Sequence, residues 1–68
     1  MGARSRLQAA FYDLATNREI RDITVQDVLD ASDVSRATFY RLFSDKYDLM
    51  NSIVLDYFRE AGHASSHD

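Results

Sequence analysis

Apolar residues recur at three- and four-residue steps through most of this chain, and neither a strand pattern nor a proline interrupts them. This spacing places side chains on one face of an α-helix, whereas a half-buried strand would need strict alternation. The chain also has no cysteine, which excludes a disulfide or a thiolate metal site. We therefore expect an all-α domain that is held together by helix packing alone.

Four segments carry the helical spacing. We predict helices at residues 4–17, 25–31, 36–43 and 46–61. The second segment follows Thr24, which together with Asp27 resembles a capping box, and the third follows Ser35, a favoured N-cap residue. Ile20 and Ile23 should turn inward beneath the connection between the first two helices.

The fourth helix has the most regular apolar spacing. Ser44 and Asp45 offer a cap for its first turn, and Gly62 is a plausible terminator. We expect residues 1–62 to form the domain and the small polar residues 63–68 to form a flexible tail.

Two short helices joined by a tight turn, at 25–31 and 36–43, match the helix-turn-helix layout. In that layout the second helix enters the major groove of DNA. The layout alone is weak support, because many small helical domains contain capped short helices. The expected fold is a small helix-turn-helix, homeodomain-like three-helix bundle that is extended by a fourth helix.

The segment from Thr24 to Leu49 resembles the signature of the tetracycline-repressor (TetR/AcrR) family of transcription regulators, and the resemblance covers roughly residues 4–60. It rests on Thr24, Val34-Ser35, Thr38-Phe39-Tyr40, Phe43, and the spacing from Phe43 to Lys46 and Leu49. The resemblance implies sequence-specific binding of double-stranded DNA by the N-terminal domain of a regulator, most often a repressor. We expect no cofactor, because the apolar residues of the chain are accounted for as core residues.

The resemblance also implies roles for individual residues. The DNA-facing part of the third helix would comprise Ser35, Arg36, Ala37, Thr38, Tyr40 and Arg41. Arg36 could pair with guanine edges, and Thr38 could contact a thymine methyl group or a phosphate. Thr24, Tyr40 and Lys46 would contact backbone phosphates.

Four positions depart from the common pattern of the family: Leu29, Asp33, Ala37 and Leu42. Leu29 replaces a small residue and suggests altered packing between the second and third helices. Asp33 replaces the turn glycine, although aspartate tolerates the left-handed conformation better than most residues. Ala37 replaces a glycine, and Leu42 removes one polar phosphate contact. Divergent DNA binding would follow from these changes.

The net charge of −3 argues against DNA binding, since such domains usually carry a basic footprint. The alternative function is an acidic helical protein-interaction module, which Asp27, Asp30 and Asp33 favour. An enzyme is not expected, because there is no cysteine, both histidines lie in the tail, and no Gly-rich loop is present. His63, His67 and Asp68 have metal-like spacing only if the tail is helical, so we predict no metal site.

The apolar face of the predicted fourth helix is broader than a three-helix core needs. We expect it to contact a second copy of the chain or the C-terminal ligand-binding domain that the family carries, which these 68 residues do not contain. No apolar run approaches the ~20 residues that a membrane span requires. A cytoplasmic location is the expectation.

Overall fold

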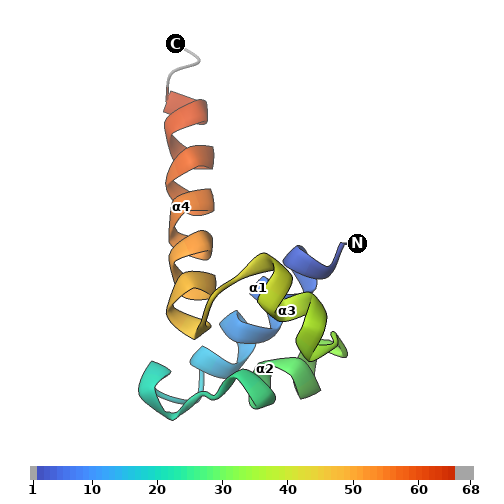
Figure 1. The fold of residues 1–68 in the computed structure, drawn as a ribbon. Coiled ribbons are helices and arrows are strands. Elements are labelled where there is room, and N and C mark those ends of the chain that lie inside the picture. Colours follow the sequence, from blue (N-terminus) through green and yellow to red (C-terminus); the bar gives the residue numbers. More distant parts are fainter. Residues whose placement is uncertain (1, 66–68) are drawn as a thin grey trace.

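The computed structural model describes the backbone of residues 2–65 and the side chains of residues 2–60. In chain order its elements are α1 (Ala3–Ala15), the 3-10 turn η1 (Ile20–Asp22), α2 (Val25–Ser32), α3 (Arg36–Leu42) and α4 (Lys46–Ser65). This part of the chain contains no strand, so the all-α prediction is confirmed (Figure 1). The first three helices form a bundle, and the C-terminal turns of α4 project away from it (Figure 1).

α2, α3 and α4 begin directly after their predicted caps. α1 begins at Ala3, one residue before the predicted start, and the ends of the first three helices also differ from the prediction. α1 ends at Ala15 because the amides of Thr16 and Asn17 turn to carbonyls three residues earlier, which tightens the last turn. α2 reaches Ser32, one residue beyond the prediction. α3 ends at Leu42, because Phe43 takes an extended conformation with φ −138°.

The predicted end of the fourth helix at Gly62 is wrong, since α4 continues to Ser65. A glycine raises the free energy of a helix interior by only about 1 kcal/mol and keeps its backbone hydrogen bonds, so four preceding turns can propagate through it. The predicted flexible tail at 63–68 therefore overlaps the end of α4. His63, His67 and Asp68 have the spacing of a metal-binding pattern, at which we predict no metal site. Residues 66–68 and the side chain of His63 lie outside the described part of the chain.

The core lies where α1, α2 and α3 meet the first turns of α4. Its buried apolar residues are Leu7, Ala10, Phe11, Ile23, Val28, Leu29, Val34, Phe39, Phe43 and Leu49. Ile23 is fully buried and Ile20 packs against the cluster, which confirms their inward orientation. Leu29, at which we expected altered packing between the second and third helices, is 6% exposed and belongs to this core.

The turn between α2 and α3 passes through a left-handed residue. Asp33 has φ 58° and ψ 37° and donates its amide to the Leu29 carbonyl, as a C-cap residue does. The Arg6 guanidinium of α1 donates to the carbonyls of Ser32 at 2.9 Å and Asp33 at 3.4 Å. A cation at a helix C-terminus is favourable because it faces the negative end of the helix dipole. The turn therefore keeps its shape without glycine.

A polar clamp joins α1 to α4. The carboxylate of Asp56 accepts hydrogen bonds from Arg4 at 2.8 Å and from Gln8 at 2.9 Å, and Gln8 also donates to the Ser52 hydroxyl at 3.1 Å. The hydrogen bond from Arg4, followed by that from Gln8, lowers the pKa of Asp56 below its ordinary value. The clamp fixes the direction in which α4 leaves the bundle.

We expect the Asp56 contribution to stability to depend on pH. The pKa of Asp56 is lower in the folded chain than in the unfolded chain, so its contribution is fully present above the unfolded value of about 4 and is lost as pH falls through the folded value. Denaturant unfolding of wild type and Asp56→Asn at pH 7 and pH 3 measures this. The difference in unfolding free energy should shrink at pH 3. A pH-independent difference would contradict the role of the Asp56 charge.

Candidate nucleic-acid interface

The start of α2 is fixed by the predicted capping box. The Thr24 hydroxyl accepts from the Asp27 amide at 3.1 Å, and the Asp27 carboxylate accepts from the Thr24 amide at 3.0 Å. Arg18 lies 3.1 Å from the same carboxylate. The hydrogen bond from the Thr24 backbone is the main cause that lowers the pKa of Asp27. Thr24 is exposed, and its hydroxyl proton is directed to no acceptor among the described residues.

The start of α3 is fixed by Ser35, as predicted. The Ser35 hydroxyl accepts from the Thr38 amide at 3.1 Å and donates to the Thr38 hydroxyl oxygen at 2.9 Å. The Ser35 hydroxyl therefore both donates and accepts a hydrogen bond within the helix cap. Thr38 keeps its own hydroxyl proton for another acceptor.

One side of α3 is buried and the other is exposed. Phe39 is fully buried, and its ring contacts Phe43 at a centroid distance of 5.8 Å. The exposed residues of the helix are Arg36, Ala37, Tyr40, Arg41 and Leu42. The ring of Tyr40 packs edge-on to Phe39 at 5.0 Å and its hydroxyl bonds to no described residue, which leaves a donor at the surface. The aromatic core thus fixes α3 with its polar side outward.

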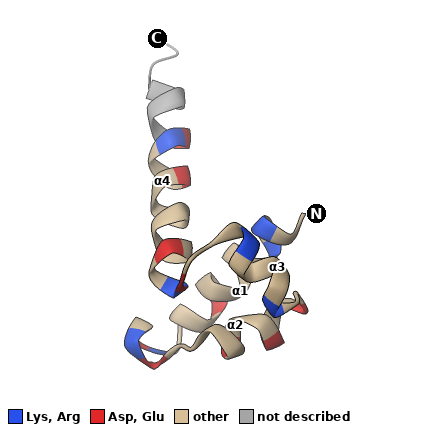
Figure 2. Ribbon diagram, viewed as in Figure 1, with Lys and Arg blue, Asp and Glu red and all other residues tan. Residues whose placement is uncertain are grey.

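The basic residues fall into two groups according to their ion pairs. Five arginines form ion pairs with carboxylates: Arg4 with Asp56, Arg6 with Asp33, Arg18 with Asp27, Arg21 with Glu19, and Arg59 with Asp56. The bases with no ion pair to a described residue are Arg36 and Arg41, both on α3, and Lys46. Figure 2 shows Lys and Arg spread over several elements, so the distinction lies in the pairing and not in the number of bases. The unpaired guanidinium charge of the described chain is concentrated on α3.

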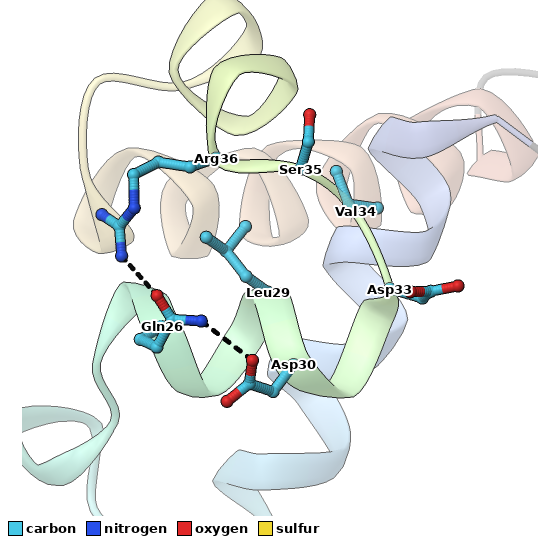
Figure 3. A pocket seen from close by; sticks show the side chains of 7 residues that line it. All are labelled: Gln26, Leu29, Asp30, Asp33, Val34, Ser35 and Arg36. Carbon is cyan, nitrogen blue, oxygen red and sulfur yellow. Dashed lines mark hydrogen bonds between the residues drawn. The ribbon is translucent and has the colours of Figure 1, made fainter.

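Arg36 is held at the edge of an open hollow between α2 and α3. Its Nη2 donates to Gln26 Oε1 at 2.6 Å, and Gln26 Nε2 donates to Asp30 Oδ1 at 2.8 Å (Figure 3). The hollow is lined by Gln26, Leu29, Asp30, Asp33, Val34, Ser35 and Arg36. The Arg36 side chain thus reaches back over α2 instead of extending freely into solvent.

Lys46 is tied to the connection that precedes α2. Its ammonium donates to the carbonyls of Ile20 and Ile23, each at 2.8 Å, and to that of Arg21 at 3.2 Å. Lys46 is the first residue of α4, where a positive charge faces the positive end of the helix dipole. The hydrogen bonds to the three carbonyls offset this unfavourable interaction with the helix dipole. All three ammonium donors are used, so the predicted phosphate contact of Lys46 would have to compete with them.

The predicted residues thus lie on three helices or at their N-caps. Ser35, Arg36, Ala37, Thr38, Tyr40 and Arg41 lie on α3 or its cap, Thr24 lies at the start of α2, and Lys46 at the start of α4. Gln26 and Asp30 were not predicted as part of the site. Their four-residue separation on α2 was the available signal, but only the fold shows that Arg36 lies beside them.

No group of metal-ligating side chains is arranged to hold an ion in the part of the chain whose side chains are described. Across the same described residues, no helix is both long enough and apolar enough to cross a membrane. The residues of the site offer guanidinium groups, hydroxyl groups and an exposed alanine methyl group, which are the groups that contact phosphates and base edges.

Two short capped helices joined by a tight turn, the second of which carries arginines that pair with no described carboxylate, form a helix-turn-helix unit. The family model described as "Bacterial regulatory proteins, tetR family" matches residues 8–53, which is more than half of the chain. The chain belongs to this family, whose N-terminal domain is the DNA-binding domain of transcription regulators. Regulators of the family are typically not enzymes. Comparisons with curated proteins and with solved structures gave no match.

Proposed function

We propose that this chain binds double-stranded DNA with sequence specificity by placing α3 in the major groove. The observation that carries the proposal is the pairing of charges. Arg36 and Arg41 on α3 have no carboxylate partner among the described residues, whereas the other arginines do. An overall charge of −3 is therefore compatible with a local positive surface on the helix that the layout directs to DNA.

Five residues of α3 have a proposed role in binding. Arg36 contacts a guanine edge, Thr38 contacts a thymine methyl group or a phosphate, and Ala37 offers a methyl group to the groove. Tyr40 and Arg41 contact phosphates, since the hydroxyl of the first and the guanidinium of the second bond to no side chain of the described residues. These contacts combine base readout with positioning on the backbone.

Three predicted residues take supporting roles in this proposal. Ser35 acts through its cap, which orients the first turn of α3. Thr24 can both cap α2 and donate its hydroxyl proton to a phosphate. Lys46 acts by holding the η1 connection in front of Thr24, because its ammonium is already bonded to three carbonyls.

A repressor role is part of the proposal and rests on the usual output of the family. We place the contact with a second copy of the chain, or with a C-terminal domain, on α4. Support comes from the large apolar side chains that are exposed there, which among the described residues are Tyr47, Val54, Leu55, Tyr57 and Phe58. Sedimentation of the isolated chain tests for the second copy.

The first test of the proposal is an amide-resolved NMR titration with a generic DNA duplex at low salt and again at higher salt. We expect salt-sensitive shifts at Thr24 and across residues 35–41, because phosphate binding releases counterions. A folded sample with no shifts there would contradict DNA binding by α3. Salt-insensitive shifts of α4 with a protein partner would instead favour the acidic interaction module.

A substitution separates base readout from phosphate binding. Arg36→Ala should reduce the preference for the best sequence by about 5- to 150-fold, the range of about 1–3 kcal/mol for a bidentate base contact. Arg41→Ala should weaken binding to all sequences alike and flatten the log–log salt slope by about 0.9. Binding-site selection and salt titration measure both. Unchanged sequence preference in Arg36→Ala would show that this arginine does not read a base.

A further inference from the structure

We infer that Gln26 and Asp30 are positioning residues that hold Arg36 in the orientation from which it reads DNA. This inference rests on the proposed function of α3. It deepens that function by assigning part of the specificity to side chains of α2. The observation behind it is the chain of hydrogen bonds from Arg36 through Gln26 to Asp30, at 2.6 and 2.8 Å (Figure 3).

The two hydrogen bonds have a fixed direction. A carboxylate only accepts hydrogen bonds, so Asp30 accepts one from the Nε2 group of Gln26. The Oε1 atom of the same amide then remains available as an acceptor. A guanidinium only donates, so it requires that oxygen. Asp30 therefore selects the amide orientation of Gln26 that can accept from Arg36. Without Asp30 the amide could rotate and present its NH₂ group to the guanidinium.

The restraint leaves most of the guanidinium free to bind. Gln26 takes one hydrogen bond from Nη2, whereas an arginine has five N–H donors. Arg36 has no ion pair with a described carboxylate, so its charge is not neutralised by the contact with Gln26. A flexible side chain loses conformational entropy when it binds, and a side chain already held in place loses less. The contact thus orients Arg36 without consuming its charge.

Asp30 has a second, opposing effect on binding. It is exposed on α2 next to the hollow and carries a negative charge that repels phosphates. A variant that removes only the charge and a variant that removes the acceptor as well should therefore behave differently. Asp30→Asn keeps an acceptor oxygen for Gln26, whereas Asp30→Ala does not. This pair distinguishes positioning from simple electrostatics.

The test uses the full chain and a selection from a random duplex library, followed by affinities for the best sequence and for its variant at the base that Arg36→Ala no longer discriminates. We expect Asp30→Asn to bind both duplexes more tightly, with the wild-type preference retained. We expect Asp30→Ala and Gln26→Ala to lower the ratio of affinities for the two duplexes by about 3- to 10-fold, which is less than the full effect of losing a bidentate base contact. Circular dichroism confirms that each variant is folded.

A double-mutant cycle between Gln26→Ala and Arg36→Ala gives the decisive result. If Gln26 acts through Arg36, the double variant loses no more preference than Arg36→Ala alone. Additive losses would show that Gln26 contacts DNA directly, and would overturn the inference while leaving DNA binding intact. The inference is equally overturned if Gln26→Ala keeps the full preference. Failure of the wild type to select any sequence would instead refute the proposed function itself.

Discussion

Phe39→Ala should lower the Tm of this domain by about 12 °C or more. Phe39 is fully buried at the centre of the core, and its ring contacts both Phe43 and Tyr40. Replacing a buried phenylalanine by alanine costs about 3–5 kcal/mol, because contacts are lost and a cavity remains. A chain of this length has a total stability of roughly 3–10 kcal/mol. The substitution therefore removes a large part of the stability that the domain has.

Thermal unfolding followed by circular dichroism measures this effect. We expect Tm to fall by about 12–40 °C, because 1 kcal/mol shifts the Tm of a small domain by roughly 4–8 °C. Tyr12→Ala is the matched control, since that aromatic ring on α1 is 65% exposed and its loss should change stability by less than about 0.5 kcal/mol. Equal Tm values for the two variants would contradict the central place of Phe39 in the core.

The local features of the fold could be predicted from sequence because they depend on residues close together in the chain. The capping box of Thr24 and Asp27 and the cap at Ser35 each involve a residue and its neighbour three positions later. The left-handed turn at Asp33 likewise follows from the few side chains that tolerate positive φ. These elements fix where α2 and α3 begin and how they are joined.

The contacts that shape the site could not be predicted in the same way. Arg36 and Gln26 are ten positions apart, and Lys46 meets the Ile20 carbonyl across 26 positions. Both pairs come together only after the helices have packed. The extension of α4 was missed for a different reason, since a glycine lowers helix propensity without specifying that a helix must end there.

The same packing explains how an acidic chain can present a basic helix. Arg4 and Arg6 both lie in α1, where one pairs with Asp56 and the other caps the end of α2. The guanidinium groups of these two arginines therefore stabilise the packing of the helices within the domain. Net charge averages over paired and unpaired groups, whereas a DNA phosphate responds to the unpaired ones nearby.

Lys46→Met should destabilise the fold by about 2 kcal/mol. The change keeps the apolar stem but leaves the Ile20 and Ile23 carbonyls, both part-buried, without the ammonium that each contacts at 2.8 Å. Hydrogen bonds to a charged group are worth about 1.5–3 kcal/mol, and the loss of one partner leaves the other desolvated. Denaturant unfolding measures the loss. Arg21→Met is the matched control, because it removes one exposed charge from the same connection without removing a donor to these carbonyls.

The salt dependence of DNA binding then decides between two roles of Lys46. If Lys46 acts by holding the η1 connection, the folded Lys46→Met variant should bind DNA with the wild-type log–log salt slope, since no phosphate contact is lost. If its ammonium leaves the three carbonyls to bind a phosphate, the slope should flatten by about 0.9. A flattened slope with unchanged stability would refute the structural role. Unchanged slope with lowered stability would mean that this lysine supports DNA binding from inside the fold.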